Sequence, residues 1–87
     1  MNLLELRIQI DKTDEKLLEL FLERMSISAK IAKYKKENGI PVHDPARESE
    51  KLSRLGKKAG EELSIYAKKF FSFVFELSRS YQSACIS

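Results

Sequence analysis

The sequence lacks tryptophan and contains little cysteine, proline and glycine. It has one cysteine, two prolines and three glycines in 87 residues. The single thiol, Cys85, excludes an internal disulfide and a cysteine-based metal site, and we expect it to be inert. Because proline and glycine interrupt regular structure, their scarcity predicts long, unbroken elements.

Long apolar runs are also missing. No run approaches the roughly 20 residues of a membrane-spanning helix, and the first apolar residues meet a charge at Glu5, unlike those of a signal peptide. We therefore expect a cytoplasmic protein that does not bind membranes. The only histidine, His43, is expected to be solvated. The sequence contains no Ser–His–Asp set, phosphate loop or metal-ligand cluster, so neither a metal nor a cofactor is predicted.

Charge is balanced rather than one-sided. The 16 basic and 13 acidic residues give a formal net charge of +3, and several basic residues come in short pairs interleaved with acids. This pattern is typical of solvated helix faces and does not favour nucleic acid as a partner. With 43% apolar residues, the composition predicts one folded domain over residues 1–87.

Residues 3–38 carry the pattern of one long helix. Apolar or aromatic side chains recur with a 3-4 spacing from Leu3 to Tyr34, interrupted only by Thr13 and Arg24. Such a stripe, held for about four heptads, indicates a helix with a buried face. The stripe ends before Asn38 and Gly39, which are typical of a helix C-terminus.

Two further helices are predicted after a short connector. Asp44 is a good N-cap and Pro45 a good first residue for a helix over residues 45–59. A third helix is expected over residues 64–84, with Ser64 as its N-cap. No segment alternates with a period of two residues, so the fold class is all-α, with one long, one short and one medium helix.

The first helix is too long for a lone chain of this size. At about 1.5 Å per residue it extends for about 54 Å, whereas a compact globule of 87 residues has a radius of gyration of about 12 Å. The other two helices cannot cover its stripe on every side. We therefore expect an intertwined homodimer whose shared core is built from the first helices.

Charged residues stand where local structure does not require them. Arg24 occupies a core-type position of the stripe, where it either fixes the helix register, leans out to solvent or serves a binding site. Lys35 follows close to three helical turns later and projects from nearly the same side. Arg47 and Glu48 open the second helix, although a cation in the first turn opposes the helix dipole. If the connector folds back, these four side chains meet.

Further polar residues extend this group. Ser78 and Gln82 continue an apolar row of the third helix, and they mark either a fraying end or a pocket between helices. Arg7 lies about 25 Å from Arg24 along the first helix, so it is either solvated or completes the site of a partner chain in an antiparallel dimer. Together with Asp44 the group has more cations than anions, which favours a small polyanion that carries carboxylates.

These residues recur at the spacings of a known family. The segments LLELRIQIDKTDEKLLELFLERMSIS, IAKYKKENGIPVHDPARESEKL and ELSRSYQ resemble the all-helical, bacterial-type chorismate mutases from end to end. The resemblance implies three-helix chains in an intertwined homodimer with two active sites. It also implies an isomerase of the shikimate pathway that converts chorismate to prephenate, on the way to phenylalanine and tyrosine.

The resemblance further implies roles for the basic residues and the glutamine. Arg24 and the partner subunit's Arg7 would bind the two carboxylates of the substrate. Lys35 and Gln82 would donate hydrogen bonds to the ether oxygen whose bond breaks. Stabilising the charge that grows on this oxygen requires no nucleophile and no metal.

The remaining site residues are assigned in the same way. Glu48, with Asp44, would hold the ring hydroxyl of the substrate, and Ser78 would contact the ring carboxylate. Arg47 would support the polar network of the pocket. Arg79 stands beside Ser78 and is assigned neither to the pocket nor to solvent.

Two alternatives stay open at this point. The first is an isochorismate-pyruvate lyase of the same fold, a group that lacks the acidic pair supplied here by Asp44 and Glu48. The second is a non-catalytic regulatory domain that senses chorismate. Such a domain has no need for Lys35 and Gln82 to converge on one point.

Overall fold

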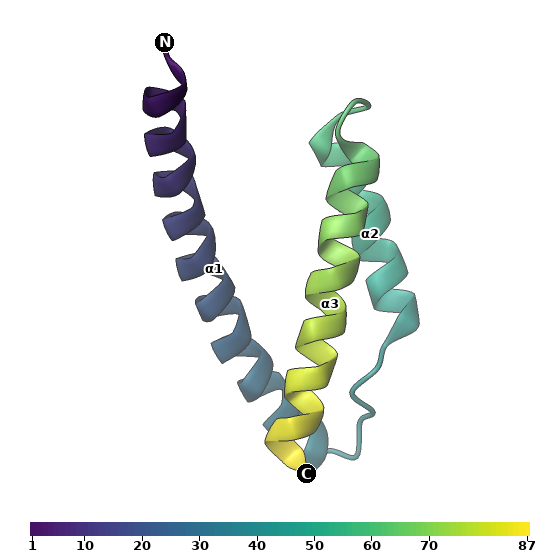
Figure 1. Ribbon diagram of the computed structural model, residues 1–87. Coiled ribbons are helices and arrows are strands. Elements are labelled where there is room, and N and C mark those ends of the chain that lie inside the picture. Colours follow the sequence, from purple (N-terminus) through teal and green to yellow (C-terminus); the bar gives the residue numbers. More distant parts are fainter.

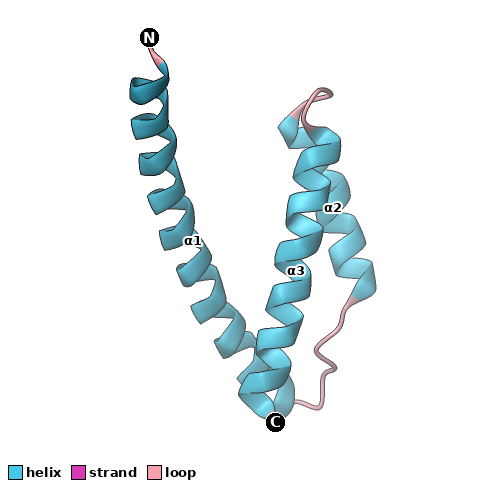
Figure 2. Ribbon diagram, viewed as in Figure 1, coloured by secondary structure: helices cyan, strands magenta, loops and turns pink.

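The computed structural model describes all 87 residues, and it contains three helices and no strand (Figures 1 and 2). Helix α1 spans Leu3–Glu37, α2 spans Pro45–Ala59 and α3 spans Ser64–Ile86. The all-α prediction with three helices is confirmed, and each helix end lies within two residues of its predicted position. None of the helices is both long and apolar enough to cross a lipid bilayer.

Local chemistry sets the ends of α1. Asn2 is its N-cap, and the side-chain oxygen of Asn2 accepts a hydrogen bond from the backbone N–H of Glu5 at 2.9 Å. At the other end Gly39 adopts a φ of 63°, a left-handed conformation that glycine reaches at little cost. Both ends therefore follow from residues next to the apolar stripe.

The starts of α2 and α3 differ. Asp44 caps α2, and its side-chain oxygen accepts from the backbone N–H of Arg47 at 3.1 Å. In α3 the prediction of Ser64 as the N-cap is wrong, because Leu63 holds that position and no side chain caps the helix. The turn over residues 61–63 runs directly into α3, which makes Ser64 the first helical residue.

Helix α3 packs against both α1 and α2, whereas α1 and α2 do not pack against each other. The N-terminal half of α1 diverges from α3, which gives the chain the shape of a V (Figure 1). At the closed end, Lys36 Nζ donates to the carbonyl oxygen of Ile86 at 3.2 Å. The longest dimension is 54 Å and the radius of gyration is 16.0 Å, above the about 12 Å of a compact globule.

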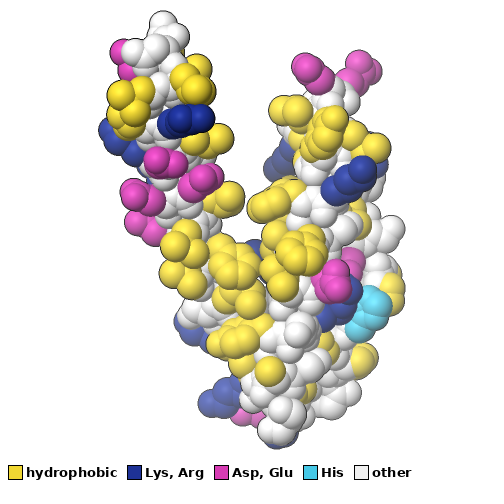
Figure 3. All heavy atoms as spheres, in the orientation of Figure 1, with side chains coloured by type: hydrophobic (Ala, Val, Ile, Leu, Met, Phe, Trp, Pro, Cys, Tyr) yellow, Lys and Arg dark blue, Asp and Glu magenta, His cyan; other side chains and the backbone are white.

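This shape leaves little of the chain buried. The buried hydrophobic residues are Ala32, Val74 and Phe75. Leu3 and Leu20 of the α1 stripe are 60% and 62% exposed, and apolar side chains gather along both arms of the V (Figure 3). The accessible surface of 7035 Å² exceeds that of a compact chain of this mass by about 1,700 Å². The α1 stripe is thus bare in a single chain.

Candidate functional site

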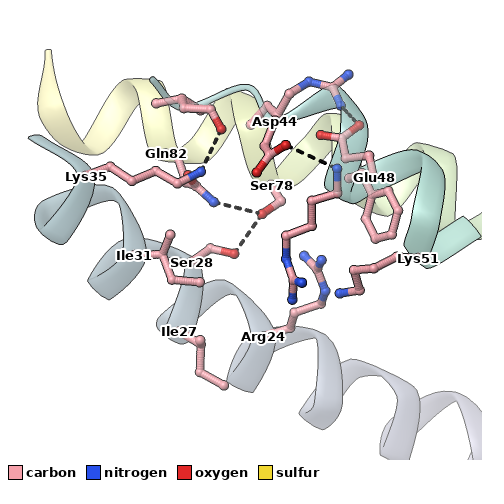
Figure 4. Close-up of a pocket in the computed structure, with 14 residues that line it drawn as sticks. Arg24, Ile27, Ser28, Ile31, Lys35, Asp44, Glu48, Lys51, Ser78 and Gln82 are labelled. Carbon is pink, nitrogen blue, oxygen red and sulfur yellow. Dashed lines mark hydrogen bonds and ion pairs between the residues drawn. The ribbon is translucent and has the colours of Figure 1, made fainter. Parts of the chain in front are cut away.

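A polar pocket of about 360 Å³ lies between α1, α3 and the beginning of α2 (Figure 4). This volume is within the range of about 300–1,000 Å³ that is usual for small-molecule sites. Of the eight predicted site residues, seven line it: Arg24, Lys35, Asp44, Arg47, Glu48, Ser78 and Gln82. The eighth, Arg7, is exposed on the diverging half of α1 and does not line the pocket.

Helical periodicity explains why α1 supplies one wall. Arg24, Ser28, Ile31 and Lys35 follow one another at intervals of three or four residues, so they share one face of α1. Near the end of this wall, Lys35 Nζ donates to the carbonyl oxygen of Val42 at 2.9 Å. This bond ties the connector to α1 and brings the first turn of α2 over the pocket.

Three cations meet in the pocket without an anion between them. Arg24 Nη1 is buried and has no hydrogen-bond partner, and its guanidinium carbon lies 5.4 Å from the centre of the Phe75 ring. Lys51 Nζ lies 5.3 Å from the same ring centre. Arg47 points into the same space, and none of the three cations forms an ion pair with an acidic side chain. The cluster is therefore suited to receive an anionic group.

The pKa directions agree with this crowding. Burial lowers the pKa of Arg24, and the negative charge of Glu48 offsets part of that effect. Burial also lowers the pKa of Lys51, and the positive charges of Arg24 and Arg47 lower it further. The shift of Arg24 expresses the cost of withdrawing its charge from water, and the shift of Lys51 adds the cost of nearby like charges. A bound anion would relieve that cost.

Uncharged hydrogen-bonding groups line the part of the pocket where α1 and α3 meet. The hydroxyl oxygens of Ser28 and Ser78 lie 2.7 Å apart and link α1 to α3. Gln82 Nε2 donates to Ser78 Oγ at 3.4 Å, and Gln82 Oε1 is buried without a partner. The amide of Gln82 and the ammonium of Lys35 approach the pocket from opposite helices (Figure 4). Each retains a proton that a ligand can accept.

The two acidic residues of the pocket are held by different partners. One carboxylate oxygen of Asp44 caps α2 by accepting a hydrogen bond from the backbone N–H of Arg47. Glu48 Oε1 pairs with Arg79 Nη1 of α3 and lies 3.9 Å from His43 Nε2. The side chain of His43, which we expect to be solvated, is 56% exposed. No group of three or more His, Cys, Asp or Glu side chains is arranged to hold a metal ion.

Sequence reasoning missed two polar residues that line this pocket, Ser28 and Lys51, and it left open whether Arg79, which also lines the pocket, belongs there. Ser28 lies four residues after Arg24, and the same helical spacing from a predicted site residue could have identified it. Lys51 lies four residues after Arg47 and carries the same signal. Arg79 lies three residues before Gln82 and carries the same signal, but its pairing with Glu48 depends on how α3 packs against α2.

The unpaired amide oxygen of Gln82 predicts a trade-off between stability and function. Replacing Gln82 by Met keeps an unbranched side chain of similar size and removes a buried acceptor that lacks a partner. We expect the Gln82→Met variant to be more stable by about 1 kcal/mol, which raises Tm by about 4–8 °C in a domain of this size. Calorimetry at one fixed protein concentration measures the change.

The control for this prediction is Gln9→Met, a change at an exposed glutamine of α1. We expect the control to leave Tm within about 1 °C, since surface substitutions are usually within ±0.5 kcal/mol. A lower Tm in Gln82→Met would mean that the amide is satisfied in solution. It would also remove the argument that the amide is kept for a ligand.

The comparisons with known proteins agree on one family. Residues 6–83 match the family described as "Chorismate mutase type II". A relative named chorismate mutase, from Methanocaldococcus jannaschii, is 34% identical over 84 residues, which cover 93% of this chain and 84% of the relative. Both findings extend over nearly the whole chain.

Two other relatives differ in length or in the substrate that they are named for. A bifunctional chorismate mutase/prephenate dehydratase from Aquifex aeolicus is 35% identical over 99% of this chain, which spans 23% of that enzyme. A 4-amino-4-deoxychorismate mutase from Streptomyces venezuelae is 32% identical over 90% of this chain and 79% of its own length.

Proposed function

The chain belongs to the type II chorismate mutase family, and we propose that the polar pocket of Figure 4 is its active site. It is an isomerase that converts chorismate to prephenate. The substrate is a small dicarboxylate with a ring hydroxyl and an ether oxygen. The reaction breaks the bond to that ether oxygen and joins two carbon ends in one unimolecular step.

The observation that carries this assignment is the buried, unpartnered Nη1 of Arg24 beside two further unpaired cations, Arg47 and Lys51. A guanidinium that is withdrawn from water and left without an acceptor is costly, and a bidentate carboxylate satisfies it. Arg24 would therefore bind one carboxylate of chorismate. Lys51 and Arg47 would add positive charge around it, and Ser78 would contact the ring carboxylate.

Lys35 and Gln82 would stabilise the transition state. As the ether bond breaks, negative charge grows on the ether oxygen, and fixed donors in a partly dry pocket stabilise that charge without reorganising. Lys35 uses one of its three protons on Val42 and has two left. Because the substrate must adopt a compact chair before it reacts, the walls that hold it also lower the barrier.

Glu48 and Asp44 would hold the ring hydroxyl. One carboxylate oxygen of Glu48 is paired with Arg79, and one carboxylate oxygen of Asp44 caps α2. Each therefore has a second oxygen that can accept from a hydroxyl. This acidic pair also argues against the isochorismate-pyruvate lyase alternative, and each of the three relatives is named as a mutase, one of them together with a dehydratase.

We further propose that the enzyme is a homodimer in which α1 packs against its copy. The excess accessible surface of about 1,700 Å² per chain would give an interface of about 3,400 Å² in total, which is usual for obligate homodimers. In an antiparallel arrangement the diverging half of one α1 lies beside the pocket of the other chain. Arg7 of the partner subunit would then reach the second carboxylate.

The first test is turnover of chorismate by the purified chain. We expect the ultraviolet absorbance of chorismate to fall and NMR to identify prephenate as the product. Arg24→Ala is expected to lose at least about 10-fold in kcat/KM, because a hydrogen-bonded charge contributes about 1.5–3 kcal/mol. Binding of chorismate without turnover would contradict the mutase assignment and favour a sensor.

A further inference from the structure

Arg79 is the one cation of the pocket that is paired with a carboxylate. Its Nη1 reaches from α3 to Glu48 Oε1 on α2, and both side chains are largely withdrawn from solvent, with 32% and 25% of their surface exposed. Both residues line the pocket. The pair is therefore part of the wall that meets a ligand and not a surface ion pair.

The ion pair has two consequences for Glu48. First, it holds one carboxylate oxygen, so the direction of the other is fixed. Second, it cancels the charge of Glu48, so Glu48 presents an oriented acceptor without net negative charge, and Asp44 is the one carboxylate of the pocket without a cationic partner. A neutral hydroxyl needs only the acceptor. An ammonium group gains most from net negative charge, and here it would also approach the guanidinium of Arg79.

We propose that Arg79 is a positioning residue that determines specificity, because its pairing with Glu48 selects substrates with a neutral ring hydroxyl over those with a ring ammonium. The proposal rests on the proposed function, in which Glu48 receives the ring substituent. The choice between the two substituents is a real one, because a relative in the comparison is named for the 4-amino substrate. An aliphatic amine is protonated near neutral pH.

The test compares chorismate with 4-amino-4-deoxychorismate on the full chain and three variants. Arg79→Met removes the charge and keeps an unbranched side chain, whereas Arg79→Lys keeps a cation. Arg54→Met is the matched control, since Arg54 lies on α2 outside the pocket and pairs with the exposed Glu50. For each protein, kcat and KM are measured separately with both compounds, and the amino compound is also measured as a competitor of chorismate.

We expect Arg79→Met to raise the preference for the amino compound by about tenfold. The preference is measured as kcat/KM for the amino compound divided by kcat/KM for chorismate, or as a fall in the inhibition constant of the amino compound. Arg79→Lys and Arg54→Met should keep the wild-type ratio. Arg79→Gln provides a second removal of the charge if the Met variant does not fold, which circular dichroism establishes.

Two outcomes would overturn the proposal. If Arg79→Met weakens both compounds equally, Arg79 serves a group that they share, such as a carboxylate. If the ratio does not change, Arg79 has only a structural role. In either case wild-type turnover of chorismate leaves the proposed function intact, whereas an inactive wild type removes the proposed function and this inference together.

Discussion

Replacing Lys35 by alanine is expected to lower kcat for chorismate by about 100- to 1,000-fold, the usual loss when one donor to a developing negative charge is removed. We expect KM to change only a few-fold, because the ether oxygen of the ground state carries little charge and gains little from the ammonium. The effect is thus concentrated in the transition state. Steady-state kinetics with chorismate, followed by absorbance, separates the two constants.

The geometry explains why this loss should be large. Lys35 Nζ is fixed by its hydrogen bond to the carbonyl of Val42 at 2.9 Å, so the ammonium is already oriented before the substrate binds. Gln82, on the opposite wall, supplies a neutral donor that cannot replace a full positive charge. Because water is partly excluded from the pocket, no solvent donor takes over at low cost.

Lys36 provides the matched control. It is the next residue of α1, but its Nζ donates to the carbonyl of Ile86 at the closed end of the V. Lys36→Ala therefore removes the same charge from the same helix turn without touching the pocket, and kcat should stay within about twofold, as expected for a surface substitution. A Lys35→Ala variant with near-normal kcat, or one that loses only substrate affinity, would remove Lys35 from its proposed role.

The helices could be predicted because their signals are local. The stripe from Leu3 to Tyr34 and the caps at Asp44 and Asn38 involve residues within one or two turns of each other. The pocket residues of α1 could be grouped for the same reason, since helical spacing fixes which side chains share a face. The single wrong cap, at Ser64, lies where the preceding turn runs directly into the helix.

The sequence could not provide the relations between helices. The pairing of Arg79 on α3 with Glu48 on α2 depends on how these two helices pack against each other, and no spacing along one helix encodes that packing. Arg7 presents the opposite case. Helix geometry predicts that it lies far from Arg24, and the single chain leaves it exposed and outside the pocket. Its proposed role therefore depends on a second chain.

That role predicts complementation between two impaired variants. Arg7→Ala would remove a carboxylate ligand that one chain gives to its partner, and Lys35→Ala would remove a donor that each chain gives to its own pocket. In a heterodimer of the two variants, both defects fall in the same site and the other site is intact. We expect such heterodimers to have about half of the wild-type kcat per dimer, because a two-fold symmetric dimer has two equivalent sites.

The experiment requires heterodimers that are purified as such. The two variants are produced together with different affinity tags, heterodimers are isolated through both tags, and kcat and KM for chorismate are measured. Each variant alone should be impaired, Lys35→Ala in kcat as above and Arg7→Ala by about 10- to 100-fold in kcat/KM, the range expected for loss of a charged hydrogen bond.

The control pairs two defects that both lie on the pocket side of the chain. In a heterodimer of Arg24→Ala with Lys35→Ala, each site carries one defect, so no intact site exists and activity should not recover. If activity recovers only in the heterodimer that contains Arg7→Ala, the recovery shows that Arg7 acts in the partner's site. A general stabilisation of the dimer would instead raise the activity of both heterodimers.

If Arg7→Ala is fully active, Arg7 is solvated, as its exposure in the single chain indicates. If Arg7→Ala is impaired but not complemented, the proposed role of Arg7 in the partner's pocket is wrong. The separation of about 25 Å along α1 also excludes Arg7 from the pocket of its own chain, so the loss would then have a structural cause.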